Sequence, residues 1–172
     1  MVLGLSVWVT NLKLDRVETV SRSPEQTQAI GRTLGVGAQK GFIYLLSGEL
    51  GSGKTCLTQG MLSGLDSEEH ARSPSFILVT QYSGRLTMYH MDLYRMEDIE
   101  AVLDLGLEEY LFGDGLSVVE WADKARNYLP AESLSVQIER IGETERRLTL
   151  ATSCENYFPL IKAISTAFGG NP

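Results

Sequence analysis

The sequence predicts an α/β fold of three layers, in which helices pack on a mostly parallel sheet that also carries antiparallel hairpin strands. Short unbroken apolar runs at residues 42–46 and 116–119 are typical of strands buried on both faces of a parallel sheet. Two pairs of segments that flank turn residues favour β-hairpins. The 172 residues suit one such domain, and no repeat or linker divides them, so we expect a single domain over residues 1–172.

The first elements are two strands and a helix. Residues 5–9 and 17–20 favour strands, the second with more reason to belong to the domain. A helix is expected over residues 23–34, because Ser23 fits an N-cap, proline follows it, and Gln26 completes a capping box. Gly35 is the expected end of this helix.

Residues 42–65 are the centre of the chain, because a strand, a glycine-rich loop and a helix follow one another there. The loop, residues 48–55, fits G-x-x-x-x-G-K-[ST], the P-loop pattern. Its glycines let backbone N–H groups approach an anion, and the helix after it directs its positive end at the same place. Lys54 is placed to reach the β- and γ-phosphates of a nucleotide, and the Thr55 hydroxyl to bind Mg²⁺. The predicted nucleotide-binding residues of this segment are Gly48, Glu49, Leu50, Gly51, Ser52, Gly53, Lys54, Thr55 and Cys56.

After the P-loop helix, the pattern alternates between strands and short helices. Apolar runs end in a carboxylate twice, at Asp92 and at Glu120. The expected elements are a hairpin of residues 76–82 and 85–91, helices at 96–103 and 107–112, a buried strand at 116–119, a short helix at 122–129, a second hairpin of 134–141 and 147–152, and an amphipathic helix at 159–168.

Asp92 and Glu120 are the candidate acidic partners of the P-loop. A P-loop enzyme holds Mg²⁺ partly through a carboxylate at the end of a neighbouring strand. Since the carboxyl ends of parallel strands line one crevice, both side chains are placed to reach the metal, and the pattern alone does not choose between them. Each also fits a solvated carboxylate at a strand end.

Other residues near the motifs allow two interpretations each. The segment Ser73-Pro74-Ser75 fits a loop that senses the γ-phosphate or an ordinary turn. Trp121 fits a ring stacked on a base or partner, or a core side chain. The acidic run of residues 97–109 fits a solvated helix face or a docking surface for a basic partner. His70 and His90 have no second His or Cys at ligand spacing, so we assign them structural or surface positions.

Composition narrows the class of protein. The net charge of −7 argues against this chain alone gripping a nucleic-acid backbone. Apolar runs are too short to span a bilayer, and residues 1–15 lack the features of a signal peptide. The two cysteines sit in no metal-ligand spacing, so we expect a cytoplasmic protein. No N-K-x-D guanine signature is present, which favours ATP as the nucleotide.

Four blocks in this order resemble the TsaE (YjeE) family: the P-loop, Ser73-Pro74-Ser75-Phe76, His90-Met91-Asp92-Leu93-Tyr94-Arg95 and Val118-Val119-Glu120-Trp121. Their order and spacing match over about residues 18–152, whereas residues 1–15 and 156–172 lie outside the match. The resemblance implies a P-loop NTPase fold and a Mg²⁺-dependent ATPase of the bacterial pathway that makes threonylcarbamoyladenosine (t6A) at position 37 of tRNA. It also implies that the TsaB–TsaD complex is the partner that holds the tRNA and transfers the threonylcarbamoyl group.

The resemblance also implies residue roles, carried over by position. Thr55 and Glu120 would ligate Mg²⁺, and Trp121 would lie beside the nucleotide. The helix that contains Thr27 would border the base. Lys54 would bind phosphates and Asp92 would be the essential acid, so the predicted catalytic residues are Lys54, Asp92 and Glu120.

Two departures from the family pattern and two rival functions stay open. Ser75 stands where the family usually has Thr, and Ala122 where it usually has Pro. A small-molecule or nucleoside kinase usually closes an Arg-bearing lid over its acceptor. Residues 96–115 contain no Arg, which counts against a kinase. A nucleotide-dependent binding module would bind ATP without turning it over. Arg72 and Arg95 are the arginines nearest the motifs in sequence.

Overall fold

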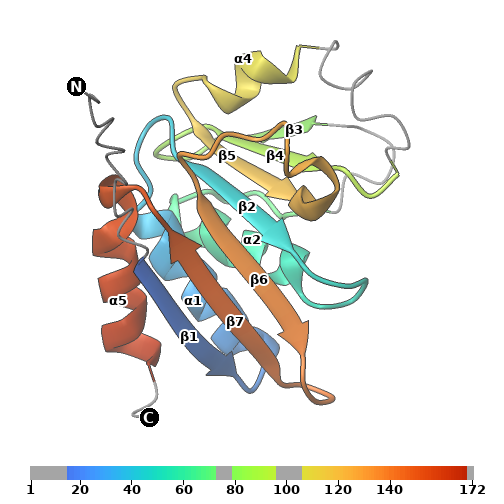
Figure 1. The fold of residues 1–172 in the computed structure, drawn as a ribbon, viewed down its shortest axis with the longest axis vertical. Coiled ribbons are helices and arrows are strands. Elements are labelled where there is room, and N and C mark those ends of the chain that lie inside the picture. Colours follow the sequence, from blue (N-terminus) through green and yellow to red (C-terminus); the bar gives the residue numbers. More distant parts are fainter. Residues whose placement is uncertain (1–14, 73–78, 96–105, 170–172) are drawn as a thin grey trace, which may run out of the picture.

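The computed structural model describes residues 15–72, 79–95 and 106–169. These residues form a seven-stranded sheet in the order β1-β7-β6-β2-β5-β4-β3 (Figure 1). The strands are β1 (Asp15–Ser21), β2 (Ile43–Ser47), β3 (Val79–Tyr82), β4 (Met88–Asp92), β5 (Leu116–Glu120), β6 (Leu134–Arg140) and β7 (Arg146–Thr152).

The sheet is parallel at its centre and antiparallel at both margins. Strands β6, β2, β5 and β4 pair in parallel, in that order. Strand β3 pairs antiparallel with β4 on one side, and β7 and β1 add antiparallel pairs on the other. This arrangement confirms the predicted mostly parallel sheet with two added hairpins. The strand expected at residues 5–9 and the helix expected at 96–103 lie outside the described residues.

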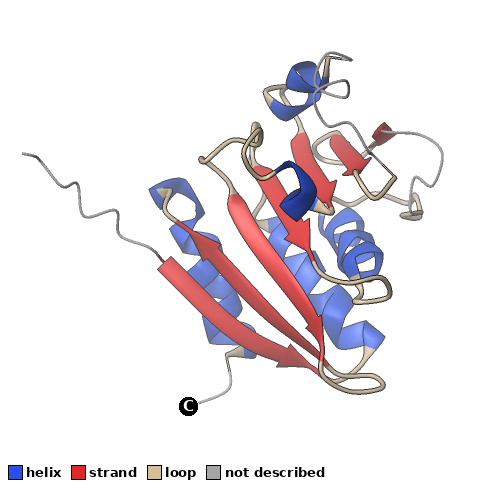
Figure 2. Cartoon of the chain, turned by 45° about the vertical axis from the view of Figure 1, so that its right-hand side comes forward, coloured by secondary structure: helices blue, strands red, loops and turns tan. Residues whose placement is uncertain are grey.

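Helices lie on both faces of the sheet and give three layers, but on the second face they cover only the part formed by β2, β5 and β4 (Figure 2). Helices α1 (Pro24–Val36), α2 (Lys54–Gly64) and α5 (Phe158–Phe168) bury their apolar sides in one core. Helix α4 (Leu107–Leu111) and the 3₁₀ turn η1 (Ala122–Ala125) pack in a second core on the opposite face. A second 3₁₀ turn, η2 (Glu155–Tyr157), precedes α5. Among the described helices, none combines the length and the apolar character needed to cross a membrane.

Helices α1 and α2 approach each other backbone to backbone. A Cβ atom on Gly31 would lie 2.2 Å from the Leu57 carbonyl oxygen, and one on Gly60 would lie 2.1 Å from the Gln28 carbonyl oxygen. Real Cβ atoms do not approach so closely, so these positions require glycine. The close packing holds α2, which begins directly after the glycine-rich loop, against α1.

Two predicted helix boundaries are wrong. Helix α1 continues through Gly35 to Val36, because Gly35 packs against α2 and does not end the helix. The helix expected at 122–129 is only the turn η1. Trp121 before it has a left-handed backbone (φ 59°). The hydrogen bonds from the Lys124 N–H to the Trp121 carbonyl and from the Tyr128 N–H to the Ala125 carbonyl span three residues, the 3₁₀ spacing, so the segment does not settle into an α-helix.

Candidate nucleotide site

The glycine-rich loop joins the carboxyl end of β2 to the start of α2. Gly48 has φ 146°, and a Cβ there would lie 2.3 Å from the Ile138 carbonyl oxygen of the neighbouring strand. Gly53, with φ 110°, is the N-cap residue of α2. The predicted strand–loop–helix unit is therefore present, and its loop lies at the edge of the sheet where the parallel strands end.

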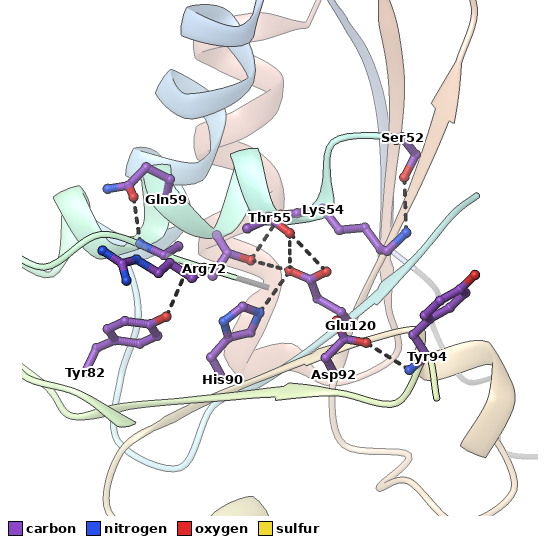
Figure 3. Close-up of polar contacts among 12 residues, drawn as sticks. Ser52, Lys54, Thr55, Gln59, Arg72, Tyr82, His90, Asp92, Tyr94 and Glu120 are labelled. Atoms are coloured by element: carbon purple, nitrogen blue, oxygen red, sulfur yellow. Dashed lines mark hydrogen bonds and ion pairs between the residues drawn. The ribbon is translucent and has the colours of Figure 1, made fainter. Parts of the chain in front are cut away.

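Lys54 is folded back on its own loop. Its Nζ donates to the Gly48 carbonyl oxygen at 2.6 Å and to that of Glu49 at 2.9 Å. It also lies 3.4 Å from Ser52 Oγ (Figure 3). The same Nζ lies 3.9 Å from the centre of the Trp121 ring, a cation–π contact. Only 5% of Lys54 is exposed. The ammonium thus has neutral partners that an anion can replace.

Glu120, the last residue of β5, gathers polar side chains from two other elements. Thr55 Oγ1 lies 3.1 Å from Glu120 Oε1 and 3.3 Å from Oε2, and it donates to this carboxylate (Figure 3). Thr58, one turn further along α2, lies 3.5 Å from Oε1. His90 Nε2 lies 2.9 Å from the same oxygen. The structure therefore brings the two predicted metal ligands, Thr55 and Glu120, together.

His90 is buried in this site, not at the surface. Its side chain is 0% exposed, and Nε2 is hydrogen-bonded to Glu120. Its other ring nitrogen, Nδ1, is buried without a hydrogen-bond partner among the described residues. An unpaired buried nitrogen is costly, so the bond of Nε2 to Glu120 has to offset the cost of burying Nδ1. The sequence did carry one signal: His90 and Asp92 are two residues apart in a strand, so their side chains lie on the same face of the sheet.

Asp92 ends β4 directly beside Glu120, because the two residues are paired in the register of β4 and β5. Asp92 Oδ1 accepts a hydrogen bond from the Tyr94 N–H at 2.8 Å, which turns the chain at the end of the strand. Burial lowers the pKa of the Lys54 ammonium, and the charges of Glu120, Asp92 and Asp123 oppose that shift. Three carboxylates therefore face the loop lysine.

The remaining predicted residues lie around this cluster or outside it. Thr27 is buried, and its Oγ1 lies 2.7 Å from Ser21 Oγ, so its side chain ties α1 to β1. Cys56 Sγ contacts the Pro24 carbonyl oxygen at 3.5 Å, which places the start of α1 against the first turn of α2. Whether Thr27 borders a base stays a prediction. The segment of residues 73–75 lies outside the described residues.

An arginine from a distant hairpin also reaches the loop, and the sequence reasoning missed it. Arg146 Nε donates to the Ser52 carbonyl oxygen at 2.8 Å. The candidates named from sequence proximity, Arg72 and Arg95, are both exposed. No local pattern identifies Arg146, because its loop partner lies 94 residues away.

The side chains at the site fit a magnesium ion that takes most of its ligands from elsewhere. In the part of the chain that the structure describes, no three His, Cys, Asp or Glu side chains gather as a metal site of their own. Mg²⁺ usually keeps several waters and binds one or two protein oxygens together with phosphate oxygens. The adjacent Thr55 hydroxyl and Glu120 carboxylate are such a donor pair.

Comparison with known proteins decides the family. The family model described as "Threonylcarbamoyl adenosine biosynthesis protein TsaE" matches residues 21–148. The chain belongs to the TsaE family. The matched range includes the TsaE loop lysine, both strand-end carboxylates and Arg146.

Individual TsaE proteins resemble the chain over most of its length. The protein of Bacillus subtilis (strain 168) named "tRNA threonylcarbamoyladenosine biosynthesis protein TsaE" is 40% identical over 144 residues, which cover 83% of this chain and 90% of that protein. The protein of the same name from Treponema pallidum (strain Nichols) is 36% identical over 132 residues, 77% of this chain and 98% of its own length.

A solved structure matches the fold. The crystal structure of Bacillus subtilis YdiB superposes with a TM-score of 0.75 and 34% identity, covering 90% of this chain and 97% of YdiB. The predicted P-loop NTPase fold is confirmed.

Proposed function

We propose that this protein is a Mg²⁺-dependent ATPase that supports the TsaB–TsaD complex in forming t6A at position 37 of tRNA, in the cytoplasm. The observation that carries the proposal is the cluster of Lys54, Thr55 and Glu120 at the carboxyl edge of the sheet. The names of the TsaE relatives, which are tRNA threonylcarbamoyladenosine biosynthesis proteins, support the pathway.

The residues of the site have distinct proposed roles. Lys54 exchanges its bonds to the Gly48 and Glu49 carbonyls for bonds to phosphate oxygens. Thr55 and Glu120 hold Mg²⁺, which when bound neutralises charge on the phosphates. Since a carboxylate beside a phosphate site suits the handling of a water molecule, Asp92 is proposed as the essential acid.

Trp121 and Thr27 are proposed to contact the rest of the nucleotide. The Trp121 ring stacks at 4.7 Å on the partly exposed Tyr94 ring and already covers Lys54, which supports a place beside the nucleotide. The contact between Cys56 and the start of α1 supports a base bordered by the helix that contains Thr27. ATP is proposed because no guanine signature is present.

The partner complex is proposed to hold the tRNA and to complete the ATPase. A net charge of −7 opposes direct binding of tRNA by this chain. Phosphoryl transfer commonly uses an arginine beyond the loop lysine and Mg²⁺. Because Arg72 and Arg95 are exposed, we expect partner docking to supply or to position such a group.

Steady-state ATP turnover by the purified chain, titrated with purified TsaB–TsaD, tests the proposal. We expect slow turnover alone and an acceleration of about two to three powers of ten, which is about 3–4 kcal/mol of barrier. Absence of hydrolysis even with the partners would favour a nucleotide-dependent binding module. Phosphate transfer to an added small acceptor would favour a kinase.

A further inference from the structure

Arg146, the first residue of β7, connects the β6–β7 turn to the phosphate loop. On the loop side, Nε donates to the Ser52 carbonyl oxygen at 2.8 Å and Nη2 lies 3.4 Å from the Gly51 carbonyl oxygen. On the turn side, Nη1 contacts three carbonyl oxygens. They belong to Gly142 (3.3 Å), Glu143 (3.3 Å) and Glu145 (2.9 Å).

All five acceptors are uncharged backbone carbonyls, and no ion pair of Arg146 is found among the described residues. A guanidinium presents five donors in a rigid fork, so one side chain can hold two backbone segments at once. The contact therefore fixes backbone geometry and places a positive charge beside the loop.

Holding these carbonyls orients the amides on the other side of the same peptide units. In a planar trans peptide, the C=O and the next N–H point in opposite directions. With the Ser52 carbonyl held by Arg146, the Gly53 N–H points away from the guanidinium, to the other side of the loop. Backbone N–H groups on the inner side of a P-loop are the groups that receive phosphates.

We propose that Arg146 is a positioning residue of the phosphate loop. It fixes the peptide unit between Ser52 and Gly53 so that the Gly53 N–H is set for an anionic phosphate, and its charge favours that anion. The Ser52 N–H is instead bonded within the loop, to the Glu49 carbonyl oxygen at 3.1 Å. This inference rests on the proposed nucleotide binding. The alternative is that Arg146 only braces the β6–β7 turn, in which case its loss changes stability but leaves phosphate binding intact.

Arg147 is a matched control one residue along the same strand. It pairs with Glu18 at 3.3 Å and with Glu139 at 2.9 Å, and among the described residues no hydrogen bond or ion pair joins it to the loop. The variants are Arg146→Ala, Arg146→Lys and Arg147→Ala. Arg146→Lys keeps the positive charge but cannot bridge the loop and the turn as a guanidinium does. It therefore distinguishes an effect of charge from an effect of loop geometry. It also replaces Arg146→Ala in the test if the alanine variant does not fold.

The first measurement is hydrogen exchange of the nucleotide-free full chain, read on peptides that cover residues 48–53. We expect Arg146→Ala to speed exchange of these amides about tenfold and Arg147→Ala to leave it unchanged. The second is calorimetry of ATP binding without Mg²⁺. We expect about tenfold weaker binding for Arg146→Ala and an intermediate loss for Arg146→Lys.

The outcomes separate this inference from the proposed function. If the wild-type chain binds ATP and Arg146→Ala binds it equally well, the inference is overturned and the function stands. A lower melting temperature with unchanged ATP affinity overturns it in the same way. If the wild-type chain binds no ATP, the proposed function fails, and unchanged loop exchange in Arg146→Ala then overturns the positioning role as well.

Discussion

His90→Leu should weaken Mg²⁺ binding while leaving the fold largely intact. In the folded chain, His90 Nε2 lies 2.9 Å from Glu120 Oε1, and the histidine is 0% exposed. A hydrogen bond to a charged group contributes about 1.5–3 kcal/mol, which is roughly 10- to 150-fold in a binding constant. Substitution of a residue that hydrogen-bonds to a metal ligand typically lowers metal affinity by about 10–100-fold, so we expect a loss of Mg²⁺ affinity in that range.

The effect on folding should be small because two terms oppose each other. The substitution removes the bond to Glu120, which keeps its contact with Thr55. It also removes Nδ1, which is buried without a partner among the described residues and costs about 1–3 kcal/mol. The free energy of unfolding should therefore decrease by much less than the free energy of Mg²⁺ binding does.

The assay is ATP binding by calorimetry over a series of Mg²⁺ concentrations. We expect His90→Leu to need about 10–100 times more Mg²⁺ for half-maximal enhancement, with metal-free ATP binding unchanged. His90→Gln, whose side-chain NH₂ can donate to Glu120, should recover much of the loss. His70→Leu, at an exposed position, is the control. An unchanged Mg²⁺ dependence in His90→Leu would refute the reasoning.

Three other substitutions test the loop, the metal ligand and the helix packing. Lys54→Ala should abolish ATP hydrolysis in the presence of partners, and a rate within about twofold of wild type would contradict its role. Glu120→Ala should weaken ATP binding with Mg²⁺ more than without it, measured by calorimetry; equal losses would make Glu120 structural. Gly60→Ala places a Cβ 2.1 Å from the Gln28 carbonyl oxygen and should cost about 1–3 kcal/mol in urea unfolding. Ser63→Ala, at an exposed position on the same helix, should leave the stability unchanged. Equal urea midpoints for Gly60→Ala and the wild-type chain would contradict the packing argument.

The elements predicted correctly are those that short-range patterns determine. The apolar run before the loop, the glycines within it and the helix after it are adjacent in sequence, so their order alone indicates a phosphate site. The two hairpins were found because turn residues separate β-rich segments. Glu120 was recognised because it ends a buried strand that proved to lie beside β2.

The contacts that were missed depend on the order of strands, which no local pattern specifies. Strand β1 lies at the sheet edge only because it pairs with β7, more than a hundred residues later. Arg146 reaches Ser52 for the same reason, and His90 reaches Glu120 because β4 and β5 are neighbours. One signal was present and unused: glycines four residues apart in both α1 and α2, the spacing that lets two helices approach closely.

The most direct test of the central claim is mass spectrometry of tRNA nucleosides from cells depleted of this protein. We predict that t6A falls on depletion, that the wild-type chain restores it, and that Lys54→Ala does not. Unchanged t6A after depletion, or full restoration by Lys54→Ala, would contradict an ATP-dependent role in this modification.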